Sequence, residues 1–153
     1  MPPEIAAAAR SGWDQVEAAV DDHHLEISLI NGDPGPDSFL LNDAGPRLDA
    51  LIDWSTALRG SLLYDLASFR VLTMSAWPAA AGWFAAGYLS ETPQIEPELQ
   101  HLDVVIKARW IANAIYFASR IERGITRGAR SPTASEDGLA QAYRGLTQTA
   151  DAG

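Results

Sequence analysis

The sequence predicts an α+β fold that is mainly α, in which a short β-hairpin precedes a bundle of helices. Three observations support this prediction. The chain has 153 residues, of which 47% are hydrophobic, enough for one compact core. Strand-like and turn-rich segments are confined to residues 25–53, and helical periodicity fills most of the remaining sequence. We therefore expect residues 1–153 to form a single domain.

The first third of the chain reads as a helix followed by a small β element. Apolar residues at helical spacing predict a helix over residues 3–20, and alternating apolar and polar residues predict a strand over 25–30. Residues 31–37 contain two Gly and two Pro, so we expect a loop whose backbone conformation these residues restrict. Short strands follow at 39–41 and 48–52, joined by a turn rich in Asn, Asp and Gly.

The rest of the chain is predicted to be helical. Apolar residues recur every three or four positions in four segments, which are residues 62–71, 78–89, 96–122 and 135–149. The third is the longest and carries two apolar stripes, so we expect it to be central in the fold.

Charge and composition exclude several classes of protein. The formal net charge is −9 and the isoelectric point is near 4.6, a surface that repels nucleic acid. The absence of Cys excludes disulfides, thiolate nucleophiles and Cys-type zinc sites. No stretch of the sequence reads as a signal peptide or as a membrane span, so we expect a cytoplasmic protein without a membrane partner.

Two acidic residues stand twenty positions apart, each close to the end of an apolar strand. Mg²⁺ prefers one or two carboxylates together with phosphate oxygens, and phosphoryl transfer needs a carboxylate near the attacking hydroxyl. Asp33 and Asp53 fit both roles. On spacing alone the signal is weak, because Asp is common in turns and ordinary turn positions are the favoured interpretation.

Three motifs in this region resemble the aminoglycoside phosphotransferase and choline kinase family. N-G-D-P-G-P-D-S at residues 31–38 is similar to the catalytic loop of the family, which usually reads H-G-D-x-x-x-x-N. L-I-D-W at residues 51–54 resembles the I-D-W or I-D-F metal motif, and G-S-L-L-Y-D-L-A at 60–67 resembles the G-x-x-x-x-D-L-A segment that opens the next helix. The resemblance implies the C-terminal lobe of a protein-kinase-like fold, without its N-terminal nucleotide lobe.

The resemblance also implies roles for the acidic residues and their neighbours. Asp33 would be the catalytic base, while Asp53 and Ser38 would bind the Mg²⁺ that accompanies ATP. Ser38 departs from the family, which has Asn at that position.

The loop itself would be supported by three residues, Asp65, Asn31 and Gly32, with Asn31 in place of the usual His. Glu98 and Asp103 are candidates for binding a substrate amine. Trp54 and Tyr64 are expected in the core.

The implied activity is ATP-dependent O-phosphorylation of a small hydroxylated molecule that also carries amines. Only thirty-two residues precede Asp33, and they contain no Lys to pair with phosphates. We therefore expect weak or no activity from this chain alone, with the nucleotide lobe on another chain or replaced in a homodimer. The alternative is a degenerate, non-catalytic module that binds a small molecule or a protein. The sequence leaves the choice between enzyme and binding module open.

Overall fold

The structure is a computed structural model that describes residues 1–22, 25–42, 48–128 and 131–148. By the density of its internal contacts, the chain divides into two compact units. Unit 1 comprises residues 1–23 and 103–153, and unit 2 comprises residues 24–102. Each unit is described by itself, and the single-domain organisation stays a prediction.

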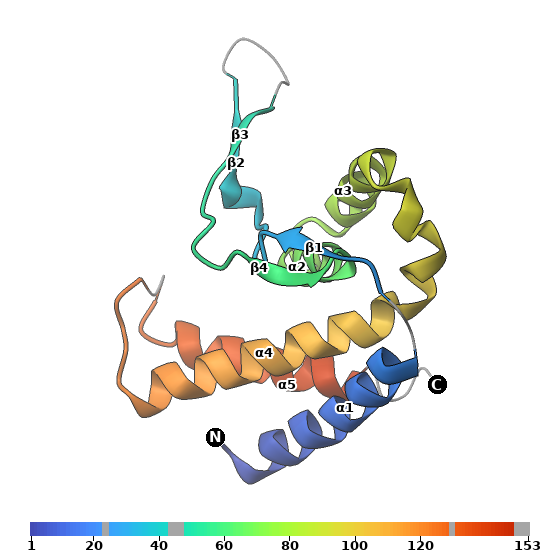
Figure 1. Ribbon diagram of the computed structural model, residues 1–153. Coiled ribbons are helices and arrows are strands. Elements are labelled where there is room, and N and C mark those ends of the chain that lie inside the picture. The colour runs from blue at the N-terminus through green and yellow to red at the C-terminus, as the bar shows by residue number, and fades with distance from the viewer. Residues whose placement is uncertain (23–24, 43–47, 129–130, 149–153) are drawn as a thin grey trace. The chain divides into compact units, whose positions relative to one another are not determined.

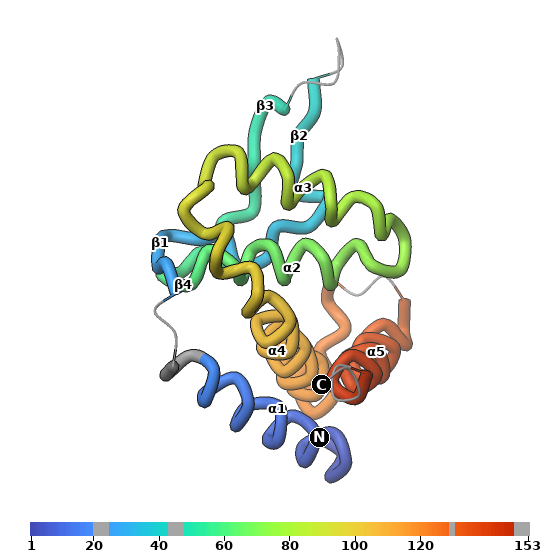
Figure 2. The backbone as a smooth tube through the Cα atoms, turned by 90° about the vertical axis from the view of Figure 1, so that its right-hand side faces the viewer, coloured from blue at the N-terminus to red at the C-terminus, as the bar shows by residue number. Residues whose placement is uncertain are grey.

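Unit 1 consists of three helices that pack against one another (Figures 1 and 2). They are α1 (Pro3–Asp22), α4 (Leu102–Glu122) and α5 (Ala134–Gln148). The core is mainly apolar, and it includes Ile5, Ala9, Val16, Ile106, Trp110, Ala114, Leu139, Ala142 and Leu146. Gly145 lets α5 approach the ring of Trp110 so closely that no β-carbon would fit between them.

Unit 2 holds both two-stranded sheets of the described chain and the helices that follow them (Figure 1). Strand β1 (Ile27–Ile30) pairs antiparallel with β4 (Leu58–Ser61), and β2 (Phe39–Leu41) pairs antiparallel with β3 (Leu48–Leu51). The helical elements are α2 (Leu63–Thr73), α3 (Pro78–Glu91) and two 3₁₀ helices, η1 (Pro36–Ser38) and η2 (Pro93–His101).

The register of the first sheet brings two distant segments together. Ile30 at the end of β1 lies opposite Leu58 at the start of β4. The loop that leaves β1 and the segment that enters β4 therefore lie at the same end of this sheet. These segments contain Asp33 and Asp53, respectively.

The sequence predicted most of these elements. The mainly helical α+β class is confirmed, as are the first helix, the strand before residue 31, the two short strands and the three shorter helices, each within a few residues. The turn predicted between the short strands falls largely on residues 43–47, outside the described part of the chain.

Two expectations were wrong, and one strand was missed. The longest helix begins at Leu102 and not at residue 96, because Pro97, which has no N–H to donate, lies within a 3₁₀ helix over the preceding residues. Strand β4 was missed, since its sequence Leu58-Arg59-Gly60-Ser61 lacks apolar alternation. Trp54 is 49% exposed and does not belong to the core.

Candidate active site

The loop after β1 has a backbone path that only glycine adopts without strain. Gly32 has a φ of 84°, in the left-handed region. A β-carbon at this position would lie 2.7 Å from the carbonyl oxygen of Thr56. The Gly of the N-G-D motif therefore allows the loop to pass close to the segment that follows Asp53.

Asp65 holds this loop from the first turn of α2. Its carboxylate accepts hydrogen bonds from the backbone N–H of Asn31 (3.0 Å) and from that of Gly32 (2.8 Å). The Ser68 hydroxyl, one turn further along α2, donates to the Gly32 carbonyl (3.3 Å). Burial raises the pKa of Asp65, and the two backbone hydrogen bonds oppose that shift.

Asn31 connects the two segments that carry the acidic residues. Its side-chain Oδ1 accepts a hydrogen bond from the backbone N–H of Asp33 (3.1 Å), while its Nδ2 donates to the backbone carbonyl of Asp53 (3.0 Å). The Thr56 hydroxyl donates to the Asn31 carbonyl (2.9 Å). With its N–H bound by Asp65, every polar group of this buried residue is paired. One carboxamide therefore keeps the backbones of Asp33 and Asp53 close together.

Asp33 itself is half-buried in the loop. Its carbonyl oxygen accepts a hydrogen bond from the Gly35 N–H (2.8 Å), and the Pro34 ring that follows is buried. These contacts fix the backbone on both sides of the carboxylate, as a positioned proton acceptor requires.

Asp53 adopts a strained backbone conformation on an exposed turn. It has a φ of 57° and is the one described residue other than Gly with a positive φ. Its Oδ1 accepts a hydrogen bond from the Ser55 hydroxyl (2.6 Å) and a longer one from the Ser55 N–H (3.4 Å). The hydroxyl bond and then the backbone bond lower the pKa of Asp53, so it is a carboxylate at neutral pH. Strain of this kind clusters at functional sites.

Ser38 lies beside the segment that leads to Asp53. Its carbonyl oxygen accepts a hydrogen bond from the Ile52 N–H (2.9 Å), one residue before Asp53. Its side chain is 8% exposed, and its hydroxyl makes no hydrogen bond to any residue that the structure describes. This backbone bond brings the Ser38 and Asp53 segments together, and carboxylate and hydroxyl oxygens are of the donor type that Mg²⁺ prefers.

An aromatic cluster supports the strand that follows Ser38. Phe39 packs edge-on against Phe69 of α2 and Phe84 of α3, at 5.9 Å between ring centroids in each case. Phe69 and Phe84 stack at 4.1 Å, and Tyr88 lies 5.5 Å from Phe84. Burial, and secondarily the charge of Asp65, raises the pKa of Tyr88 to about 12. The cluster ties the start of β2 to both helices.

Glu98, one of the two candidate amine-binding residues, is bound near the opposite end of β1 from the N-G-D loop. It accepts a hydrogen bond from the Glu26 N–H (2.8 Å) just before β1, whereas the N-G-D loop leaves the other end of that strand. At about 3.3 Å per residue, these ends are roughly 16 Å apart along the strand. Asp103 belongs to the first turn of α4, in unit 1.

Sequence reasoning missed Ser55, Thr56 and Ser68, whose hydroxyls all contact the site. The position of Ser55, two residues after a strand-end Asp, was the only local signal, because such a spacing favours a turn closed by the Asp side chain. Nothing in the local sequence marks Thr56 or Ser68, since their acceptors lie 25 and 36 residues away.

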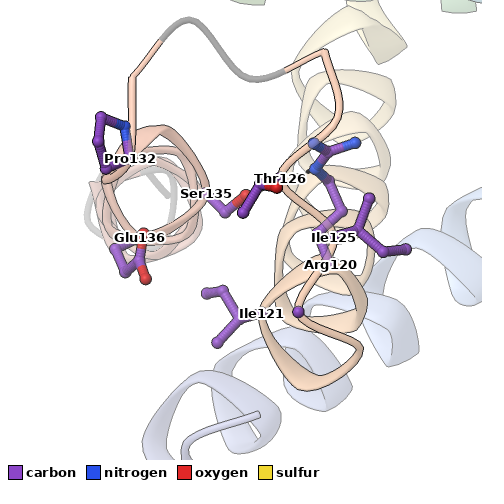
Figure 3. Close-up of a pocket in the computed structure, with 8 residues that line it drawn as sticks. Arg120, Ile121, Ile125, Thr126, Pro132, Ser135 and Glu136 are labelled. Carbon is purple, nitrogen blue, oxygen red and sulfur yellow. Dashed lines mark hydrogen bonds between the residues drawn. The ribbon is translucent and has the colours of Figure 1, made fainter.

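A separate hollow of about 90 Å³ lies between the end of α4 and the start of α5, in unit 1 (Figure 3). The Arg120 guanidinium at its wall donates to the Ser135 hydroxyl (3.4 Å), the Tyr116 hydroxyl (3.2 Å) and the Arg127 carbonyl (2.7 Å). Arg120 therefore holds the segment after α4 against the adjoining helices. None of the predicted site residues lines the hollow.

Two features are absent from the residues that the structure describes. No group of three or more His, Cys, Asp or Glu residues in this part of the chain could hold a metal ion. No helix within the described ranges is both long enough and apolar enough to span a bilayer.

Comparison with known proteins gives one match. The family model described as the phosphotransferase enzyme family matches residues 2–100, which is more than half of the chain. Neither the curated proteins nor the solved structures gave a match. The matched range includes α1, the N-G-D loop, the hairpin and the helices α2 and α3.

Proposed function

The chain belongs to the phosphotransferase enzyme family, and on that premise we propose that it supplies the catalytic base and the metal ligands for phosphoryl transfer from ATP to a small molecule. The observation that carries the proposal is the Asn31 carboxamide, which binds the backbone of Asp33 with one atom and that of Asp53 with the other. Phosphoryl transfer needs a base and a metal held in fixed relation, because positioning and charge stabilisation supply nearly all of the catalysis.

In this proposal Asp33 accepts the proton of the attacking hydroxyl. The hydroxyl oxygen then forms a bond to the γ-phosphorus of ATP while the bond to the bridging oxygen breaks and ADP leaves. Asp53 and Ser38 would hold Mg²⁺, which when bound supplies positive charge to the phosphate oxygens. The lowered pKa of Asp53 supports this role, because a metal ligand must be ionised at the working pH.

The substrate class follows from charge and from the attacking group. The acceptor must carry a hydroxyl, and the net charge of −9 favours a substrate that is also a cation, such as an amino alcohol or amino sugar. Glu98 and Asp103 stay candidates for an amine contact in this proposal.

We further propose that these 153 residues are weak or inactive on their own. Residues 24–102 contain three Arg and no Lys, whereas kinases of this type pair a Lys with the nucleotide phosphates. A second lobe on another chain, or a second copy of this chain, would supply the missing contacts to the nucleotide phosphates. Ser38 supports the alternative of a non-catalytic binding module, because a hydroxyl is a poorer metal donor than the amide oxygen usual in the family.

Titration calorimetry with Mg²⁺-ATP tests the proposal on wild type, Asp53→Asn and Asp49→Asn. Asp49 is an exposed β3 residue, so Asp49→Asn reproduces the charge change away from the candidate metal ligands. We expect binding by wild type and Asp49→Asn, and loss of binding in Asp53→Asn. Equal binding by all three would remove Asp53 from the metal site, and no binding by any would favour the non-catalytic alternative.

The base is tested separately by Asp33→Asn. This variant should bind Mg²⁺-ATP as wild type does, yet lose the weak phosphate transfer that wild type gives to a panel of small amino alcohols and amino sugars. Transfer by Asp33→Asn at the wild-type rate would show that Asp33 is not the base.

A further inference from the structure

Ser55 makes two contacts with the candidate metal ligand. Its hydroxyl and its backbone N–H both donate to the same oxygen of Asp53, Oδ1, at 2.6 and 3.4 Å. The other oxygen, Oδ2, accepts no hydrogen bond from any residue within the described ranges. The two oxygens of this carboxylate are therefore in different environments, one bound by the protein and one open.

The donor is fixed to the same scaffold as the acceptor. The Ala57 N–H donates to the Trp54 carbonyl (3.1 Å), which closes a turn around Ser55. The Thr56 hydroxyl and the Asp53 carbonyl are each bound to Asn31. The turn that carries Ser55 is thus attached at both ends to the residue that also binds the backbone of Asp33.

An exposed Asp side chain would otherwise sample several rotamers. Asp53 is exposed, so packing does not select its χ1 angle. A short hydrogen bond from a hydroxyl to a carboxylate belongs to the stronger class of hydrogen bonds. The Ser55 contact can therefore select one rotamer, and the rotamer it selects leaves Oδ2 available.

We infer that Ser55 is a positioning residue that holds Asp53 by Oδ1 and presents Oδ2 to the metal as a single-oxygen ligand. This inference rests on the proposed function, because it assigns Asp53 to Mg²⁺. Mg²⁺ requires near-ideal octahedral geometry and so benefits from a carboxylate that is already oriented. Mutation of a residue that orients a metal ligand typically lowers metal affinity by 10- to 100-fold.

The test compares Ser55→Ala with Ser55→Thr, which keeps the hydroxyl. Ser28→Ala is the matched control, because Ser28 is exposed on β1 and its side chain makes no hydrogen bond to the described part of the chain. In Mg²⁺-ATP calorimetry we expect Ser55→Ala to bind about tenfold more weakly than wild type. Ser55→Thr and Ser28→Ala should bind within about twofold of it.

A second readout needs no ligand. In the metal-free protein, NMR coupling constants should report one dominant χ1 rotamer for Asp53 in wild type and Ser55→Thr, and averaged rotamers in Ser55→Ala. Averaged rotamers in wild type would overturn the inference whatever the calorimetry gives.

The remaining outcomes separate the two proposals. Equal or tighter binding by Ser55→Ala, while Asp53→Asn fails to bind, would overturn the role of Ser55 and leave the metal site in place. No binding by wild type would favour the non-catalytic alternative and, with it, overturn the metal role of Ser55.

Discussion

Replacing Asn31 by Asp changes the chemistry of one side-chain atom while keeping its shape. The Nδ2 that donates to the Asp53 carbonyl becomes an oxygen, which cannot donate when the group is ionised. Asn31 is 1% exposed, so water cannot replace the lost partner. Asn31→Asp therefore tests whether this carboxamide joins the two segments.

The expected loss at neutral pH is about 3 kcal/mol of unfolding free energy. Roughly 1 kcal/mol comes from the lost hydrogen bond, and about 2 kcal/mol comes from a buried carboxylate that faces a carbonyl oxygen. Burial should raise the pKa of the introduced carboxyl above about 3.9, its ordinary value. Because the folded state then binds the proton more tightly, the penalty is absent below about pH 4 and grows as pH rises through the folded pKa. The protonated carboxyl can donate to the Asp53 carbonyl as the amide does.

Urea unfolding followed by circular dichroism, at pH 7.5 and at about pH 4, measures this effect. Asn113→Asp is the control, since Asn113 is half-buried on α4 and its side chain has no hydrogen bond to the described residues. A loss that is equal at both pH values, or no larger than that of Asn113→Asp, would refute the role of Asn31 as the connecting residue.

Two further outcomes follow from the same structure. Gly32→Ala should cost roughly 2–3 kcal/mol, because its φ of 84° disfavours a β-carbon that would also lie 2.7 Å from the Thr56 carbonyl. The control is Gly82→Ala, which lies in open space on α3 and should stabilise the chain by about 0.5–1 kcal/mol. Similar effects of the two changes on urea unfolding would contradict the close approach of Gly32 to the Thr56 carbonyl. In ultraviolet titration, the difference between wild type and Tyr88→Phe should show a phenol that ionises near pH 12, about two units above an ordinary Tyr. Since the folded state holds that proton more tightly, the stability that Tyr88 contributes is present below about pH 10 and is lost as pH rises toward 12. A difference titration centred near pH 10 would disprove the burial of Tyr88 beside Asp65.

Local patterns in the sequence determined several elements of the fold and marked two residues of the candidate site. The two Gly and two Pro of residues 31–37 restrict the backbone, so they predicted a loop without any knowledge of its neighbours. Helical spacing of apolar residues predicted α1, and the N-G-D and I-D-W motifs marked Asp33 and Asp53. Each of these features is set by residues within a few positions of one another, where short-range geometry dominates.

Only the tertiary structure decided how those parts meet. Strand β4 has no apolar alternation, and it is a strand through its pairing with β1. In that pairing Gly60 lies opposite Ser28, and a β-carbon on Gly60 would lie 2.9 Å from Cδ1 of Ile30. The contact between Asn31 and Asp53 joins residues 22 positions apart, and Asp65 reaches the loop from 34 residues away. Such contacts depend on the path of the chain between them, which local residue patterns do not encode.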